Sequence, residues 1–301
     1  MTLPEKLAAA HDGLAVGPVE SRGILRVTGK DRLDYLQRMC TQDLSRLRPG
    51  DSAYAAFLTA KGHLVGEGTV LAREEDLLVD VAPQALGATR AHLEKFVIMD
   101  DVVLEDLSGA LAVLPVLGSG GAAAAEPGVT RGASRRRGAP ALDLYLPPDQ
   151  AAALRVALIS RGAVPLEAGD LEVLRIEGGL ARFGADMDGD RLPMEAGLTR
   201  DAIHFGKGCF IGQEVVLRAT VRGHLQKGLV QLALPPGAGP GARLLAGGQE
   251  VGWVTSAAET SQGRLGLGYL RRAHWKAGER LATDGGEAVV RRVIVEEGTC
   301  Q

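Results

Sequence analysis

A short glycine-rich stretch brings a thiol and an amine close together in the sequence. Residues 206–214 have the sequence GKGCFIGQE, in which Lys207 lies two residues before Cys209. Glycines allow positive φ angles and let a ligand approach the backbone, and the residues after Gly212 have the pattern of a helix start. A nearby helix N-terminus and a lysine both favour a thiolate. The stretch therefore predicts a functional thiol at Cys209 with Lys207 as its activator. The alternative is a tight turn with an inert cysteine and a solvated lysine.

This stretch resembles the K-G-C-[YF]-x-G-Q-E signature of the YgfZ family. These are folate-binding proteins related in fold to the aminomethyltransferase, or T-protein, of the glycine cleavage system. The similarity covers most of the chain, since it continues at LRIEGGL (174–180), PMEAGL (193–198), VGWVTS (251–256) and LGLGYL (265–270). The resemblance implies an α+β fold with three lobes in a cloverleaf around a central folate channel, the third lobe being a small C-terminal β-barrel.

The implied cofactor is tetrahydrofolate or a one-carbon-substituted folate. A carboxylate can accept both N–H groups on the guanidine-like edge of a pterin. In the aminomethyltransferase relatives the glutamate of the matching E-A-G-L segment has this role, so the resemblance implies Glu195 as a folate ligand. The alternative is a surface glutamate. Arg218 and Arg222, four residues apart on one expected helix, are candidates for binding the glutamate tail of the folate. Lys207 is a further candidate partner for a carboxylate.

A departure from the transferase pattern lies in the segment GHLVGE (62–67). In the aminomethyltransferases the matching hairpin carries two aspartates, one of which assists at the reacting nitrogen of tetrahydrofolate. Here Gly66 and Glu67 occupy these positions. Because a longer side chain beside a glycine is not expected to hold the same geometry, Glu67 is a candidate folate contact and the transferase chemistry is expected to have changed. The transferases also have an aspartate where Cys209 stands.

Composition narrows the possible functions. The formal charge of −3 over 301 residues shows no overall basic field for nucleic acid. The three cysteines are spread far apart and the six histidines are scattered, which fits neither a disulfide framework nor a metal site. No stretch is long and apolar enough to be a signal-peptide core or a membrane span. We expect a soluble, cytoplasmic, monomeric protein without a metal ion and without direct nucleic-acid contact.

Hydrophobic periodicity predicts an α+β body followed by short strands. Helices are expected over 31–40, 85–97 and 148–161, with a strand hairpin turning at Gly62. The segment 118–140 is predicted to be a loop or a ragged hairpin. Near its end lie three arginines, residues 135–137, which we expect on a solvated surface. The alternative is that they contact phosphate. Two similar strand–helix series predict two intertwined, pseudo-repeated lobes over 1–224, and the strands over 225–301 predict a barrel.

Three functions follow from these observations and the resemblance. The first is an accessory protein that binds tetrahydrofolate and supports assembly or repair of iron–sulfur enzymes, including those that thiolate tRNA, with Cys209 as the functional thiol. Its partners would be folate and these client enzymes, and whether it catalyses a one-carbon or thiol-dependent transfer stays open. The second is an aminomethyltransferase, which the missing aspartate pair disfavours. The third is a folate-binding module without catalysis.

Overall fold

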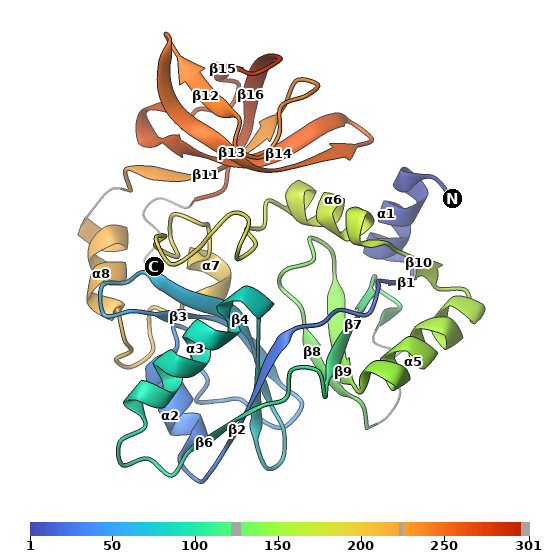
Figure 1. Cartoon of the computed structure of the whole chain (residues 1–301), viewed down its shortest axis with the longest axis vertical. Coiled ribbons are helices and arrows are strands. Elements are labelled where there is room, and N and C mark those ends of the chain that lie inside the picture. The colour runs from blue at the N-terminus through green and yellow to red at the C-terminus, as the bar shows by residue number, and fades with distance from the viewer. Residues whose placement is uncertain (122–127, 223–224, 296–301) are drawn as a thin grey trace.

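The computed structural model describes residues 1–121, 128–222 and 225–295. Within them the chain forms two five-stranded sheets and one closed six-stranded barrel. Figure 1 shows the barrel above the two sheets, which lie side by side. No helix among the described residues is long and apolar enough to cross a membrane.

The first lobe is an antiparallel sheet on which two helices pack. Buried side chains from the sheet and from both helices form a single apolar core. Gly62 lies in the turn between the strands Ser52–Leu58 and Leu64–Ala72, and its φ of 76° is one that favours glycine. The strands in spatial order are β3 (Ser52–Leu58), β4 (Leu64–Ala72), β5 (Leu77–Val81), β2 (Gly23–Thr28) and β6 (Val103–Asp106), and the helices are α2 (Arg32–Met39) and α3 (Pro83–Phe96).

The second lobe is built on a smaller, mixed sheet. Its most N-terminal strand comes from the segment that precedes the first lobe in the chain. That the two lobes are intertwined pseudo-repeats stays a prediction. Among the described strands of this sheet only β1 and β10 pair in parallel, and α5 packs on the sheet through a separate apolar core. The strands in spatial order are β10 (Val164–Pro165), β1 (Ala15–Val16), β7 (Ala112–Leu117), β9 (Ala141–Leu146) and β8 (Thr130–Ala133), with the helices α1 (Leu3–Asp12) and α5 (Pro148–Ser160).

The segment between the second lobe and the barrel runs through the centre of the molecule (Figure 1). It packs against strand β3 on one side and the barrel on the other, because its apolar side chains share one core with both. Its elements are α6 (Ala168–Gly178), α7 (Thr199–Ala202), α8 (Gln213–Leu217) and a π-helical turn over Arg218–Arg222.

The C-terminal lobe is a closed barrel with its own apolar interior. Its first strand, β11, pairs with both β14 and β16, which closes the sheet and leaves it without a free edge. The strands are β11 (Lys227–Ala233), β12 (Arg243–Ala246), β13 (Gln249–Thr260), β14 (Gly263–Arg271), β15 (Arg280–Thr283) and β16 (Gly286–Val293), with a 3₁₀ turn over Arg272–His274.

The expected fold class is confirmed, since the chain is α+β with a C-terminal barrel. The three expected helices and the hairpin at Gly62 are present. Helices α1 and α6 and strand β15 were not anticipated. The expected lobe boundary between residues 224 and 225 falls partly outside the described residues, as does part of the segment 118–140, and the boundary stays a prediction.

Candidate functional site

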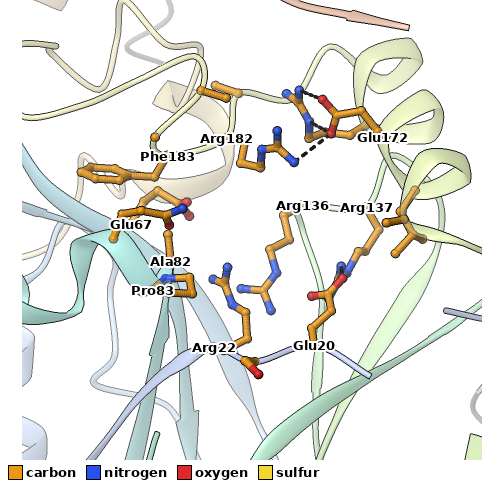
Figure 2. Close-up of a pocket in the computed structure, with 18 residues that line it drawn as sticks. Glu20, Arg22, Glu67, Ala82, Pro83, Arg136, Arg137, Glu172, Arg182 and Phe183 are labelled. Atoms are coloured by element: carbon orange, nitrogen blue, oxygen red, sulfur yellow. Dashed lines mark hydrogen bonds and ion pairs between the residues drawn. The ribbon is translucent and has the colours of Figure 1, made fainter. Parts of the chain in front are cut away.

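A cavity of about 520 Å³ lies between the two sheets and the central segment. This volume falls within the range of about 300–1,000 Å³ that small-molecule sites occupy. Figure 2 shows acidic and basic side chains from both lobes directed into it. Its lining comes from the segment before β2, from β4, from the start of α3, from α6 and from the residues around Phe183, and includes Glu20, Arg22, Glu67, Arg136, Arg137, Glu172, Arg175 and Arg182.

Glu67 brings a buried carboxylate to this cavity. Its strand β4 pairs with β3, and the hydroxyl of Tyr54 on β3 donates a hydrogen bond of 2.6 Å to Glu67 Oε2. Burial, together with the neighbouring carboxylate, raises the pKa of Tyr54 well above its usual value, so the phenol remains a hydrogen-bond donor at neutral pH. Glu67 is therefore held in place as an acceptor at the cavity wall.

Gly66 faces away from the cavity because neighbouring residues of a strand point to opposite sides. A Cβ atom built at this position would lie 2.4 Å from Thr89 Oγ1 and 3.3 Å from the Cβ of Ala85, both on α3. Position 66 thus has no room for a carboxylate, and position 67 alone of the two presents one to the cavity. That this changes the transferase chemistry stays a prediction.

Asp80 on β5 joins two of the cavity arginines. It accepts hydrogen bonds of 2.7 Å from Arg22 Nε and from Arg136 Nη2, and the hydroxyl of Tyr145 donates a third. Burial by itself would raise the pKa of Asp80, but the charges of Arg136 and Arg22 outweigh it and lower the pKa. The carboxylate is therefore ionised, and it fixes one arginine from each lobe against the other.

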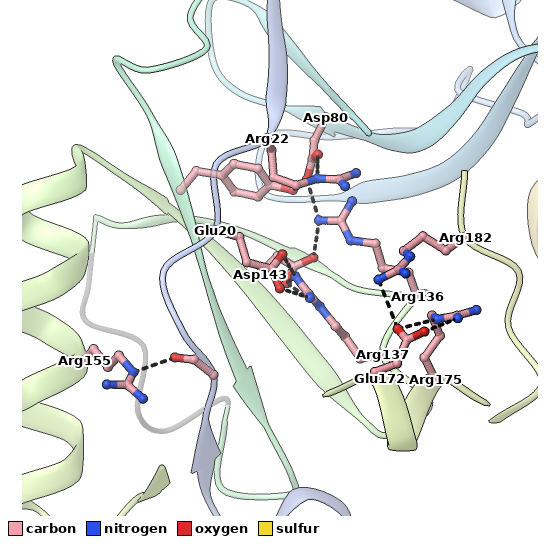
Figure 3. A network of polar contacts seen from close by, with 12 residues as sticks. Glu20, Arg22, Asp80, Arg136, Arg137, Asp143, Arg155, Glu172, Arg175 and Arg182 are labelled. Atoms are coloured by element: carbon pink, nitrogen blue, oxygen red, sulfur yellow. Dashed lines mark hydrogen bonds and ion pairs between the residues drawn. The ribbon is translucent and has the colours of Figure 1, made fainter. Parts of the chain in front are cut away.

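Asp143 on β9 extends this network into the second lobe, as Figure 3 shows. It accepts bonds from Arg136 Nη2 at 2.8 Å and from Arg137 Nη2 at 2.7 Å, and Arg137 also binds Glu20. The expectation of a solvated triplet over 135–137 is therefore wrong for Arg136 and Arg137, which are largely buried and ion-paired. The sequence alone did not reveal their carboxylate partners, because Asp80 and Asp143 lie on strands of different lobes.

A second charged group lies at the side of the cavity formed by α6. Arg175 binds Glu172 at 2.6 Å and the buried Asp186 at 2.6 Å, and Arg182 binds Glu172 at 3.0 Å. Sequence reasoning missed these residues. The available signal was Arg175, which lies inside the otherwise apolar run 173–176. Because arginines are rarely buried unless paired, this position predicts a carboxylate partner.

Glu195 does not line this cavity. Its side chain is 8% exposed and its Oε2 accepts one backbone hydrogen bond of 3.3 Å, from Leu192. Burial raises the pKa of Glu195, and the positive charges of Lys227 and Arg191 oppose the shift. Arg191 in turn lies over the rings of Trp253 and Tyr269 from the barrel. Glu195 thus belongs to a junction between the central segment and the barrel.

Lys207 anchors its loop to the end of α2. Its Nζ donates to the carbonyls of Gln37 at 2.7 Å, Cys40 at 2.8 Å and Gln42 at 2.6 Å. These three bonds use all the donors of an ammonium group. Burial lowers the pKa of Lys207. The predicted role as activator of Cys209 therefore receives no support from these contacts, and neither does the role as a carboxylate partner.

Cys209 is exposed, whereas Cys40 is buried in the core of the first lobe as its helical pattern predicts. Helix α8 begins four residues after Cys209, at Gln213, which agrees with the expected helix start. Cys300 lies outside the described residues.

The two candidate arginines follow α8 in the π-helical turn 218–222. Arg218 is exposed, and the side chain of Arg222 is not among those described. A π-helix closes its hydrogen bonds over five residues, so the four-residue spacing no longer aligns side chains as it would in an α-helix. Of the five predicted site residues whose side chains the structure describes, only Glu67 lines the cavity.

Comparison with known proteins gives three findings. Residues 5–128 match the model of the GCVT N-terminal domain. An aminomethyltransferase of Rubrobacter xylanophilus is 30% identical over 280 residues, which cover 84% of this chain and 74% of the relative, and one of Halalkalibacterium halodurans is 26% identical over 93% of this chain and 85% of the relative. The crystal structure of the glycine cleavage system aminomethyltransferase T from Bartonella henselae superposes with a TM-score of 0.81, at 21% identity over 98% of this chain and 90% of that one.

Proposed function

Because this chain belongs to the aminomethyltransferase family, we propose that it binds tetrahydrofolate or a one-carbon-substituted folate in the cavity between its two sheets. The cavity carries this proposal. It combines a fixed carboxylate acceptor, Glu67, and an aromatic ring, Phe183, with several arginines. A folate is complementary to this set, since it has an N–H-rich aromatic pterin at one end and carboxylates at the other.

Titration of the purified protein with tetrahydrofolate tests this assignment. Glu67→Gln keeps the size of the side chain and removes its charge, so it should weaken binding about tenfold. Glu74→Gln, an exposed glutamate outside the cavity lining, is the matched control and should bind as the wild type does. Unchanged affinity in Glu67→Gln would place the pterin elsewhere. Glu195→Gln in the same titration tests the role that the resemblance implies for Glu195.

We further propose that the protein acts as an accessory factor for assembly or repair of iron–sulfur enzymes, including those that thiolate tRNA, with Cys209 as the functional thiol. The support is the YgfZ-type signature around Cys209, the exposure of its side chain and the presence of one carboxylate where the transferases carry two. The thiol would accept a one-carbon unit, transfer sulfur or hold a cluster transiently, and these three alternatives stay open.

A complementation experiment tests the accessory role. A strain lacking this gene would receive the wild type or Cys209→Ser, and both a tRNA-thiolating iron–sulfur enzyme, through its modified nucleoside, and glycine cleavage would be assayed. We expect loss of tRNA thiolation with intact glycine cleavage, restored by the wild type alone. Loss of glycine cleavage alone would contradict the accessory role.

The second candidate function is aminomethyl transfer, because the relatives described above are named aminomethyltransferases. In this case Glu67 would be the carboxylate that assists at the folate nitrogen. Formation of methylene-tetrahydrofolate from an aminomethyl-lipoyl carrier, lost in Glu67→Gln, would support it. A folate-binding module without catalysis is the third candidate, and it predicts that Cys209→Ala complements fully.

A further inference from the structure

Two of the cavity arginines have nitrogens that no described residue satisfies. Arg22 Nη2 and both Nε and Nη1 of Arg136 are buried and have no hydrogen-bond acceptor among the described residues. The remaining bonds of these two guanidinium groups are well formed, since Asp80 binds one nitrogen of each and Asp143 binds Arg136. Buried donors without an acceptor are unfavourable, so these nitrogens on two cavity-lining arginines are candidates to bind a ligand group.

The two guanidinium groups are close together and fixed. Both bind the same carboxylate, Asp80, at 2.7 Å, and Figure 2 shows them side by side in the cavity. Each side chain is 12% exposed, and both line the cavity. Arg137 differs, because Glu20 and Asp143 satisfy it. Among the described residues that line the cavity, the buried donors without an acceptor therefore all belong to this pair of arginines.

We propose that Arg22 and Arg136 form an oxyanion site, which binds a carboxylate or phosphate group of a ligand in the cavity. The donors lie on two different arginines, so a partner needs several lone pairs in different directions, and an oxyanion supplies them. Glu67 repels an anion from its own part of the cavity. The other lining arginines, Arg137, Arg175 and Arg182, bind carboxylates and have no buried donor without an acceptor. Where the oxyanion is the glutamate carboxylate of folate, the inference rests on the proposed function. Where it is a free anion, the inference stands without it.

Three probes separate these sources in titrations at low ionic strength. Inorganic phosphate carries the oxyanion alone, 6-methyltetrahydropterin carries the pterin without any carboxylate, and tetrahydrofolate carries both. Each is titrated into the wild type, Arg22→Gln and Arg155→Gln. Arg155 is the control, because it is a partly buried arginine that binds Gly17 and lies outside the cavity lining.

Three results support the site. If Arg22→Gln weakens tetrahydrofolate about tenfold and leaves 6-methyltetrahydropterin unchanged, the oxyanion is the folate glutamate. If Arg22→Gln abolishes phosphate binding while both pterin compounds bind as before, the site takes a separate anion. Phosphate binding that depends on Arg22, in a protein that binds neither pterin compound, would uphold the site and contradict the proposed function.

Two results overturn the site. One is equal binding of all probes by the wild type and Arg22→Gln. The other is equal weakening of 6-methyltetrahydropterin and tetrahydrofolate without any phosphate binding, which would assign the acceptor to the pterin. Should Arg22→Gln fail to fold, the wild type decides: its melting temperature must rise with phosphate beyond the effect of chloride at matched ionic strength, and no rise overturns the proposal.

Discussion

The cavity and the Cys209 loop are two candidate sites of opposite kinds. The cavity is assembled from residues far apart in the chain, and its charges are fixed by ion pairs such as those of Asp80 and Asp143. The loop is continuous in the sequence, and Cys209 on it is exposed. Lys207 on this loop is buried and binds backbone carbonyls. The comparison teaches that the most recognisable motif in a sequence need not line the cavity in which the charged residues of the fold gather.

The largest expected effect concerns the ion pairs of the cavity. Asp80→Ala would leave Arg22 and Arg136 without their shared carboxylate, and removing one partner of a buried ion pair costs about 3–5 kcal/mol. We expect a loss of this size in the free energy of unfolding, measured by urea denaturation. Asp149→Ala, at an exposed position, is the control. A loss below about 1 kcal/mol, as for a surface pair, would show that the network does not hold the lobes together.

The second largest effect is expected at Lys207, which anchors the Cys209 loop. Lys207→Met removes three charge-assisted hydrogen bonds to the end of α2, and we expect the free energy of unfolding to fall by about 2–3 kcal/mol. Cys209→Ala on the same loop should change it by less than about 0.5 kcal/mol, because its side chain is exposed. Equal effects of the two variants in urea denaturation would contradict the assignment of Lys207 as a structural anchor.

A smaller effect is expected at Gly66, where strand β4 packs closely against helix α3. Gly66→Ala places a Cβ atom 2.4 Å from Thr89 Oγ1, and we expect this overpacking to destabilise the protein by about 1–3 kcal/mol. Gly87→Ala is the matched control on α3, because nothing lies within 4 Å of its added Cβ. That change should raise stability by about 0.5–1 kcal/mol. Thermal unfolding of both variants distinguishes the two outcomes. Unchanged stability of Gly66→Ala would show that helix α3 shifts to make room for the added Cβ atom.

The smallest expected effect is the pH dependence contributed by Glu195. Its pKa is raised in the folded protein by burial, so the folded state holds this proton more tightly than the unfolded chain. The resulting stability is fully present below the unfolded pKa of about 4.5 and is lost as the pH rises through the folded pKa. Glu195→Gln should therefore flatten this part of the curve of unfolding free energy against pH. A curve that keeps its slope in the variant would assign the slope to other groups.

Much of the fold followed from local sequence patterns. The apolar spacing over 31–40 predicted α2, and the glycine at position 62 predicted the hairpin turn. The barrel followed from short strands between turn residues, although β15 was missed because its four residues alternate too briefly to be recognised. Helix α6 was not predicted, since charged residues interrupt its apolar run at Glu172 and Arg175.

The candidate site was harder to predict, and Arg136 shows why. Its sequence neighbours predicted a solvated cationic surface, but strands from both lobes bring Asp80 and Asp143 against it and bury it. The sequence by itself determined the fold class, the buried Cys40 and the presence of an acid at position 67. Only the tertiary structure decided that Glu67 faces a cavity, that Lys207 binds carbonyls instead of a thiol, and that two arginines keep unsatisfied donors. The physical reason is that propensity and periodicity are local properties of the chain, whereas the pairing of buried charges depends on which distant segments the fold brings together.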